Sequence, residues 1–223
     1  MTHILNIETA TKNCSVALAV DGKTILCREA AEFGYSHAEK LHVFIEEILA
    51  ESGLRFKDLS AIGVSQGPGS YTGLRIGISA AKGLCFALDI PLVAVETLSI
   101  LAAQVEVTDG IIIPVIDARR MEVYSAVFNS DNEKIREVRA EIITENSFAE
   151  VTSKIYFAGD CLEKCKTVLT KDNYIFLDEI VYPSATQMGS LSYNKYKKND
   201  IVDVAYFEPY YLKDFISNAK KVL

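Results

Sequence analysis

The chain has 223 residues, 49% of them hydrophobic and 24% charged, and a formal net charge of −7 at pH 7, which suits one large or two small α/β units with sizeable cores. This acidic balance disfavours a protein that holds nucleic acid by itself, because Lys and Arg supply most of the nonspecific affinity for phosphates. No apolar run approaches the roughly 20 residues that span a bilayer, and the first residues lack the pattern of a secretory signal peptide, so we expect a cytoplasmic protein without a membrane partner.

The first half of the chain predicts an antiparallel meander followed by alternating helices and strands. Three short strands are expected at HILNIET, CSVALAV and TILCREA, with Asp21 and Gly22 as a hairpin signal between the last two. Ser36 and Glu39 form a capping box before an amphipathic helix that ends near Gly53. A buried strand (LSAIGVSQ), a second helix (Gly73–Leu88), a fifth strand (PLVAVET) and a short helix then follow.

The second half repeats this order. The polar link around Thr108, Asp109 and Gly110 marks the domain boundary, so the sequence predicts one unit at 1–106 and another at 107–223. The second unit is expected to have strands at GIIIPVID, EVYSAVFN, KIREVRAEII, KIYFAGD and YIFLDEIV, with helices at NSFAEVTS, LEKCKTVL and Ser184 to Lys195. The shared order indicates a duplicated α/β architecture.

The glycine-rich stretch GPGSYTGLRIG (67–77) resembles a phosphate-binding loop at first sight. A Walker loop would need Lys after its last glycine, whereas Leu74 follows Gly73. A dinucleotide loop needs the spacing GxGxxG, whereas the first three glycines here are spaced GxGxxxG. What remains is a glycine turn with Ser70 and Thr72 as candidate N-caps, and a helix N-terminus whose amides could receive an anion.

The helix at Gly73–Leu88 is unusual because two faces lack charge. One apolar face suits packing on a sheet; it contains Leu74, Ile78, Ala81, Cys85 and Leu88. A second stripe contains Gly73, Gly77, Ala80 or Ala81, and Leu84. Two glycines inside a helix cost about 1 kcal/mol each relative to Ala, and close approach of another helix would offset this cost. That helix could come from the same chain (36–52), from another subunit, or from both.

No metal site is expected from the cysteines and histidines. The five cysteines are expected to be reduced and packed, and Cys161 with Cys165 lacks the two further ligands that zinc requires. His37 and His42 are five residues apart, so their rings lie roughly 140° apart around a helix and cannot share an ion. A capping or solvent-facing role is expected for both.

Several segments, read together, resemble the TsaB family, also called YeaZ. They are ILNIETATKNCSVALAVDGK, SHAEKLHVFIEEILAESGL, IGVSQGPGSYTGLRIGISAAKGL, PVIDARRMEVYSAVF and YFAGD. The resemblance implies an α/β fold of the actin-like ATPase (ASKHA) superfamily, with two ribonuclease H-like subdomains and mixed sheets. It also implies a noncatalytic subunit that dimerises with TsaD, which transfers threonylcarbamoyl to adenosine 37 of tRNAs reading ANN codons. A TsaE-type ATPase joins the pair, tRNA is bound only indirectly through the complex, and the chain alone is expected to form a homodimer.

The resemblance places the partner contact on the N-terminal helices. The expected partner-binding residues are therefore Leu41, Ile45, Leu49, Gly73, Arg75, Ile76, Gly77, Ala80, Ala81 and Leu84. Arg75 and Lys82 are expected to edge this face and to contact acidic groups of the partner.

No catalytic residue is expected in this chain. Active kinases of the superfamily carry Asp-x-Gly after the first strand, whereas this chain has Glu8, Thr9 and Ala10, and a β-carbon at Ala10 crowds the approach of phosphate. A vestigial nucleotide site is expected at Glu8, Thr9, Thr11 and Asp117. No cofactor is assigned to the chain itself, and ATP with Mg²⁺ is left open at the level of the complex. The alternatives are a free-standing phosphotransferase that uses Glu8, Thr9 and Asp117, and a zinc hydrolase.

Overall fold

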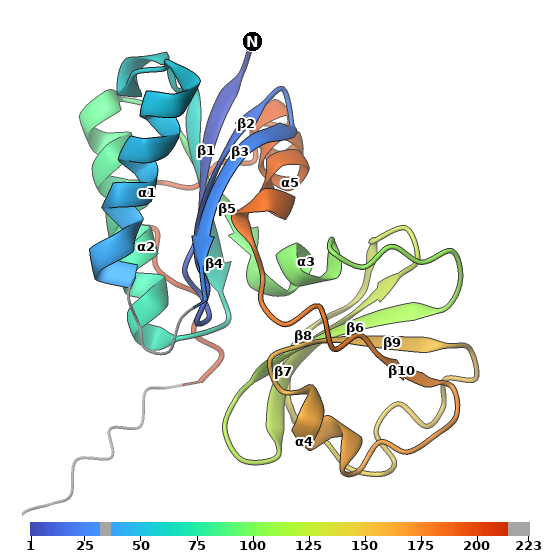
Figure 1. Cartoon of the computed structure of the whole chain (residues 1–223). Helices are drawn as coiled ribbons and strands as arrows, with labels where there is room; N and C mark the ends of the chain where they lie inside the picture. The colour runs from blue at the N-terminus through green and yellow to red at the C-terminus, as the bar shows by residue number, and fades with distance from the viewer. Residues whose placement is uncertain (32–36, 214–223) are drawn as a thin grey trace, which may run out of the picture.

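The computed structural model describes residues 1–31 and 37–213, which form two α/β units (Figure 1). The first sheet has the strand order β3-β2-β1-β4-β5. Its strands are β1 (His3–Glu8), β2 (Cys14–Val20), β3 (Lys23–Ala30), β4 (Ala61–Gly67) and β5 (Leu92–Glu96). The first three are antiparallel, whereas β4 and β5 run parallel to β1. The predicted hairpin is confirmed, since Asp21 and Gly22 both have positive φ at its turn.

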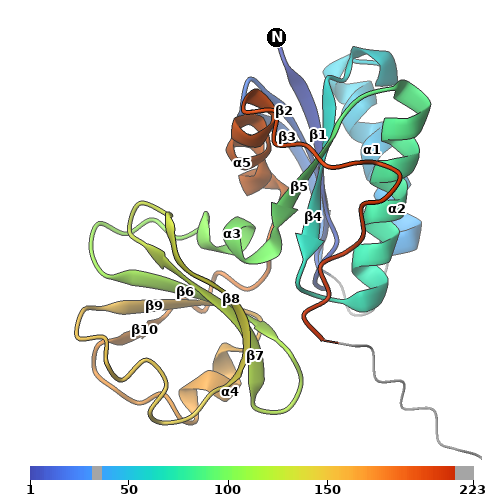
Figure 2. The same cartoon turned by 180° about the vertical axis from the view of Figure 1, so that it is seen from behind.

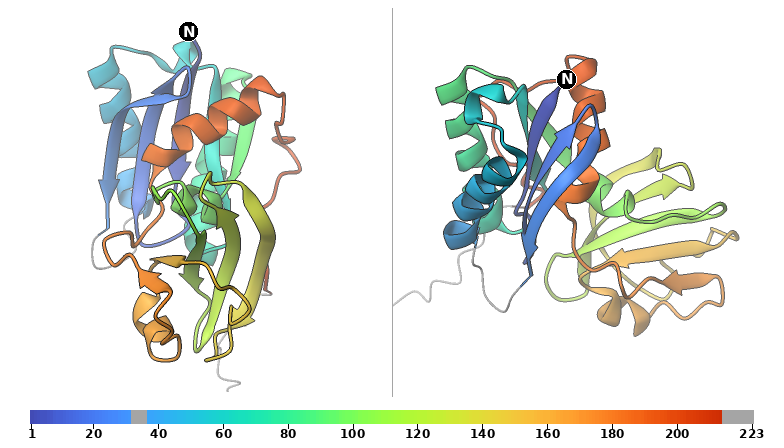
Figure 3. Two further views of the ribbon diagram at one scale, coloured as in Figure 1. Left: turned by 90° about the vertical axis from the view of Figure 1, so that its right-hand side faces the viewer. Right: turned by 45° about the horizontal axis from the view of Figure 1, so that its top comes forward.

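Helices cover both faces of the first sheet (Figures 1 and 3). On one face lie α1 (His37–Ser52) and α2 (Tyr71–Leu88), with the short helix η1 (Phe56–Asp58) between them in the chain. On the other face lies α5 (Ala185–Lys197), which contacts β1, β2 and β3. Because both faces are covered, the central strands β1 and β4 are almost entirely buried. The short helix α3 (Thr97–Ala102) follows β5 directly.

The second sheet repeats the topology of the first, with the order β10-β9-β6-β7-β8. Its strands are β6 (Ile111–Asp117), β7 (Glu122–Asn129), β8 (Lys134–Ile142), β9 (Ile155–Gly159) and β10 (Tyr174–Phe176). The helix α4 (Leu162–Lys166) lies between β9 and β10 in the chain. The predicted helix at NSFAEVTS is wrong, because those residues form turns. The core of this unit is built around Phe157, whose ring stacks on that of Phe176 with 5.2 Å between the ring centroids.

The chain returns to the first sheet after β10, which differs from the expected second unit at 107–223. Ala185 and Met188 of α5 are fully buried against the first sheet, in one cluster with Ile4, Ala17 and Val93. A hydrophobic pattern shows that α5 is buried on one side, but it does not show which of two sheets receives it. The first strand of the second sheet, β6, begins at Ile111, after α3 ends at Ala102.

The last described residues form an extended segment, Val202–Lys213, which we call the C-terminal strap. It runs from the edge of β5 along α2 (Figure 2). Val202 N donates to Leu92 O at 3.0 Å, and Tyr210 N donates to Gln66 O at 2.7 Å. In the part of the chain that the structure describes, no helix is long and apolar enough to cross a membrane.

Candidate functional site

The glycine-rich stretch packs against the β1–β2 connection of its own chain. A β-carbon on Gly69 would stand 2.3 Å from Ala10 O, one on Gly73 would stand 2.1 Å from Thr9 O, and one on Gly77 would stand 2.2 Å from Thr9 Oγ1. Thr9 Oγ1 also donates to Gly73 O at 2.8 Å. These three glycines therefore let the stretch approach Thr9 and Ala10 closely, and they do not form a phosphate cradle.

The nearest neighbour of both Gly73 and Gly77 is Thr9 of the β1–β2 connection, and the expected approach of another helix is found only at Gly73, where His37 of α1 would lie 3.3 Å from a β-carbon. The N-cap prediction is confirmed for Ser70, whose hydroxyl accepts from Gly73 N at 3.2 Å. Thr72 lies inside α2, which begins at Tyr71. Since Ser70 already uses the Gly73 amide, the helix N-terminus has lost one of the donors that an anion would need.

Glu8 lies at the end of β1 and is fully buried. Its Oε1 accepts from Ala10 N at 2.5 Å, while Oε2 has no hydrogen-bond partner among the described residues. Burial raises the pKa of the Glu8 carboxyl to about 7. A carboxyl closed off in this way cannot reach a metal ion or a nucleotide without a rearrangement of the β1–β2 connection.

Thr11 is held by His37 at the start of α1. His37 Nε2 donates to Thr11 O at 2.8 Å, and the ring is completely buried. The expected solvent-facing role is wrong for His37 and is confirmed for His42, which is exposed. Burial lowers the pKa of His37, which favours the neutral ring. Of the expected capping box, Ser36 lies outside the described residues.

Asp117 stands in the second unit, at the end of β6. Its carboxylate accepts from Lys164 Nζ and from Arg119 N, the latter at 3.3 Å. Its own backbone N donates to Asp160 Oδ1 at 2.9 Å. No hydrogen bond or ion pair within residues 1–31 and 37–213 joins Asp117 to Glu8, Thr9 or Thr11. These four residues are therefore not joined by direct polar contacts, and the nucleotide site stays a prediction.

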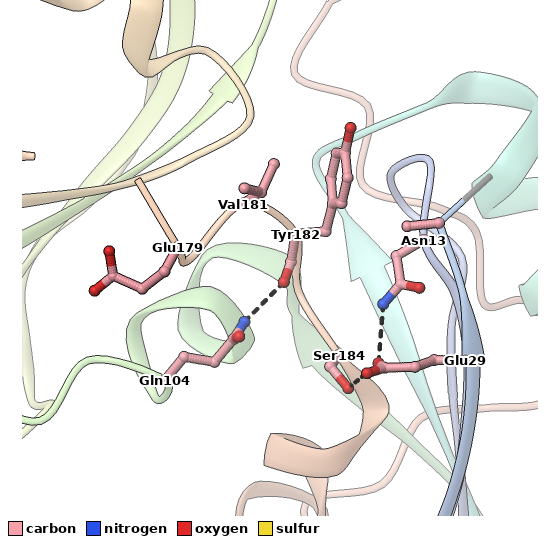
Figure 4. Close-up of a pocket in the computed structure, with 8 residues that line it drawn as sticks. Asn13, Glu29, Gln104, Glu179, Val181, Tyr182 and Ser184 are labelled. Atoms are coloured by element: carbon pink, nitrogen blue, oxygen red, sulfur yellow. Dashed lines mark hydrogen bonds between the residues drawn. The ribbon is translucent and has the colours of Figure 1, made fainter. Parts of the chain in front are cut away.

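A cavity of about 310 Å³ lies beside the segment that leads from the second unit into α5 (Figure 4). Asn13 Nδ2 donates to Glu29 Oε2 at 3.2 Å and to Pro183 O at 3.1 Å, and Ser184 Oγ donates to the same Glu29 oxygen at 2.6 Å. Gln104 Nε2 donates to a backbone carbonyl of this segment at 2.9 Å. These contacts fasten the connecting segment to the first unit. None of the expected nucleotide-site residues lines the cavity.

The expected partner-binding residues lie on different sides of α1 and α2. Six of them are buried inside the first unit: Leu41, Ile45, Leu49, Gly73, Gly77 and Ala81. They cannot contribute side-chain surface to a partner, because they already pack on the sheet or on Thr9. The other four reach the outer side of α2: Ile76, Ala80 and Leu84 are half-buried, and Arg75 is exposed.

We call the outward side of α2 the open face. It contains Ile76, Ser79, Ala80, Gly83, Leu84, Phe86 and Ala87, and none of these side chains is charged. Phe86 is 86% exposed, and a β-carbon on Gly83 would meet nothing within 4 Å. Val43 of the neighbouring helix α1 is 49% exposed. Residues 79, 83, 86 and 87 are not among the expected partner-binding residues, because that prediction follows the glycine stripe; their spacing opposite the core stripe is the signal that identifies them.

The C-terminal strap borders the open face. Lys82 Nζ donates to Ala205 O and Phe207 O at 3.1 and 2.9 Å. The Arg75 guanidinium lies 4.0 Å from the Tyr71 ring centroid and donates to Tyr211 Oη at 3.0 Å. The two charged residues expected to contact a partner therefore hold the chain's own strap. A hollow of about 520 Å³ remains between α2 and the strap, beside Gly83 and Phe86.

Within the two described ranges, no group of three or more His, Cys, Asp or Glu residues could hold a metal ion. All five cysteines are free thiols, and burial raises the pKa of Cys85 to about 12, as expected for a packed thiol.

Comparison with known proteins decides the family. A family model described as "TsaD: tRNA N6-adenosine threonylcarbamoyltransferase" matches residues 30–214. The chain is 30% identical to the tRNA threonylcarbamoyladenosine biosynthesis protein TsaB of Haemophilus influenzae, over 96% of this chain and 94% of the relative. It is 29% identical to TsaB of Escherichia coli, over 96% of both chains. The chain belongs to the TsaB family.

A solved structure agrees with this assignment. YeaZ from Pseudomonas aeruginosa superposes with a TM-score of 0.83 at 26% identity, over 95% of this chain and 100% of that chain. The expected α/β fold with two mixed sheets is confirmed, and both sheets have the same strand order. Membership of the TsaB family gives the chain a role in tRNA threonylcarbamoyladenosine biosynthesis. The match to a TsaD model also shows that this chain is related to the transferase itself.

Proposed function

We propose that the chain is a noncatalytic cytoplasmic subunit that dimerises with a TsaD-type catalytic subunit. In this complex the TsaD-type subunit transfers threonylcarbamoyl to adenosine 37 of tRNAs that read ANN codons, and a TsaE-type ATPase joins the pair. The chain's contribution is to bind and activate the catalytic subunit.

The open face of α2 is the observation that carries this proposal. The chain has a net charge of −7, yet this helix face is uncharged and presents Phe86 almost fully to solvent. Aromatic side chains are enriched at protein interfaces, and the small residues Gly83 and Ala87 beside Phe86 leave room for the backbone of a partner. Ile76, Ala80 and Leu84 extend the surface towards α1.

The state of Glu8 and Asp117 supports a noncatalytic role. Glu8 is buried with a raised pKa, and Asp117, although exposed, is already paired with Lys164. Phosphoryl transfer requires exposed carboxylates that hold Mg²⁺ against the phosphates. A free-standing phosphotransferase therefore fits these residues poorly, and ATP with Mg²⁺ enters the proposal only through the partners.

We propose that the same face also forms the homodimer of the isolated chain. A twofold axis through the open face would bring Phe86 of one copy against Gly83 or Ala87 of the other, which is the self-complementary arrangement of an isologous interface. Such a homodimer would have to separate before the TsaD-type subunit could bind. The two assemblies then compete for one surface.

The direct test is reconstitution of tRNA modification from purified TsaD-type and TsaE-type subunits, with and without this chain. We expect threonylcarbamoyladenosine to form at a substantial rate only when the chain is present, and the chain alone to turn over no ATP. A Glu8→Gln variant serves as the control for residual chemistry, since it removes the carboxylate without changing the shape of the side chain. ATP turnover by the isolated chain that is lost in this variant would contradict the noncatalytic assignment.

A further inference from the structure

The tip of the β6–β7 hairpin carries two consecutive arginines in the left-handed backbone region. Arg119 has φ 72° and Arg120 has φ 53°. The tip is closed by Glu122 N, which donates to Arg119 O at 3.2 Å, and by Ala118 N, which donates to Glu122 O at 3.1 Å. Glycine and Asn adopt this conformation at much lower cost than Arg. Both arginines are exposed, so neither the backbone nor core packing explains their presence.

The acidic residues around this tip already have cationic partners. Asp117 pairs with Lys164, and Glu122 pairs with Lys213 at the end of the strap. Among the described residues, neither Arg119 nor Arg120 has a carboxylate within ion-pair distance. The two guanidinium groups therefore carry uncompensated positive charge on a chain whose net charge is −7.

A lysine from the first unit adds to this charge. Lys12 is exposed on the β1–β2 connection, and it is close enough for its charge to lower the pKa of Asp160, although burial raises that pKa overall. Figure 1 shows the β1–β2 connection, the end of the strap and the β6–β7 tip on the same side of the molecule. Both units therefore contribute cations to one basic surface, which we call the basic tip (Lys12, Arg119 and Arg120).

The base of the tip is held firmly. Lys164 Nζ donates to Arg120 O at 2.9 Å and to Glu122 O at 2.7 Å, in addition to its ion pair with Asp117. One partly buried ammonium group thus fixes the backbone from which both guanidinium groups project. Less conformational entropy is lost on binding when the backbone that carries an arginine is already fixed than when it belongs to a mobile loop.

We propose that the basic tip contacts phosphate groups of the tRNA backbone while the tRNA is bound to the modification complex. This inference rests on the proposed function, since it assigns a tRNA contact to this subunit. Arginine forks pair with phosphate through two parallel hydrogen bonds. The negative charge elsewhere on the chain repels a polyanion, so an isolated basic surface restricts where the tRNA backbone can approach.

The test uses the double variant Arg119→Asn with Arg120→Asn. Asparagine accepts the left-handed backbone, so this variant should fold at least as well as the wild-type chain. The matched control is Lys23→Asn with Lys57→Asn, which removes the same charge. Lys23 is paired with Val20 in the sheet, and Val20 is paired with His3 on its other side. Lys57 precedes Asp58, whose backbone carbonyl lies 2.9 Å from His3 Nδ1. The control residues therefore lie beside the beginning of β1, whereas Lys12 follows its end, so the two sets are at opposite ends of the strands.

Two quantities are measured at saturating TsaD-type partner: the KM for an unmodified tRNA transcript, and the salt dependence of tRNA affinity by fluorescence anisotropy. We expect KM to rise about tenfold in the arginine variant with kcat within about twofold. The magnitude of the slope of log affinity against log salt should fall by about 1.4 to 1.8, since each of the two lost phosphate contacts removes roughly 0.7 to 0.9. The control should retain the wild-type KM and lose less than half as much slope.

Equal KM and equal slopes for the two double variants would overturn the inference. So would a loss of affinity for the TsaD-type subunit with unchanged tRNA affinity of the assembled complex, because the tip would then belong to a protein interface. If the wild-type chain fails to support modification, the proposed function fails, whereas the anisotropy comparison still tests the tip on its own.

Discussion

Gly77 of α2 lies against the side chain of Thr9, and a β-carbon at position 77 would stand 2.2 Å from Thr9 Oγ1. The Thr9 hydroxyl is fixed in place, since it donates to Gly73 O at 2.8 Å. This contact joins α2 to the β1–β2 connection. It also explains why glycine is needed in the middle of a helix, where it is otherwise unfavourable.

A Gly77→Ala substitution should therefore destabilise the isolated chain, by roughly 1–3 kcal/mol as for other overpacked sites. The same substitution in a Thr9→Ala background should cost much less, because that change removes Thr9 Oγ1, and the next nearest atoms, Thr9 Cβ and Cγ2, would be 3.4 Å from the new methyl group. Urea unfolding of the four proteins gives the coupling energy between the two positions. Equal costs in both backgrounds would show that Gly77 is required for another reason.

Much of the fold could be predicted from periodicity and turn residues, because these are local properties. Asp21 and Gly22 mark a hairpin through their tolerance of positive φ, and the apolar stripe of α2 shows its buried side. The position of α5 could not be predicted, since its amphipathic pattern fits either sheet. The purpose of Gly73 and Gly77 could not be predicted either, because their neighbour Thr9 is more than sixty residues away in the chain.

The open face provides the second prediction. A Gly83→Arg variant should keep or gain stability, because no atom lies within 4 Å of the new β-carbon and replacement of a helical glycine by Arg contributes up to about 1 kcal/mol. The long charged side chain should nevertheless weaken binding to the TsaD-type subunit at least tenfold. Calorimetric titration with the partner measures this effect.

Two control variants separate the loss of the glycine and the added charge from the position of that charge on the open face. Gly83→Ala should gain similar stability and keep most of the affinity for the TsaD-type subunit. Ser190→Arg adds the same charge on α5, which covers the opposite face of the sheet, and should also keep this affinity. Sedimentation of the isolated chain should show the homodimer weakened by Gly83→Arg alone. Unchanged affinity in Gly83→Arg would exclude the open face as the partner site.

The strap provides the third prediction. Lys82 is tied to the strap by hydrogen bonds to two carbonyl groups, so Lys82→Met should release it locally while keeping the aliphatic packing of the side chain. Hydrogen exchange should then become faster at Val202 N and Tyr210 N, which bond to β5 and β4. Exchange in the interior strands should not change. Lys57→Met, at an exposed lysine of η1, is the control, and equal exchange in both variants would show that Lys82 does not hold the strap.

Glu8 provides the fourth prediction, through the pH dependence of stability. Its pKa is about 7 in the folded chain against 4.5 without the fold, so the folded state retains a proton that the unfolded state loses between these values. This contribution to the free energy of unfolding is complete below pH 4.5 and is lost as pH rises through 7. The loss amounts to about 3 kcal/mol, at 1.36 kcal/mol per unit.

The Glu8→Gln variant should lack this dependence, because its amide does not ionise. We therefore expect the variant to gain about 3 kcal/mol relative to the wild-type chain between pH 4.5 and pH 7.5, as measured by urea unfolding at each pH. Taking the difference cancels other titrating groups such as His37, whose lowered pKa acts in the opposite direction and costs stability as pH falls. A difference that stays constant across this range would mean that the Glu8 carboxyl is ionised inside the fold, with a counter-charge or solvent reaching it through the β1–β2 connection.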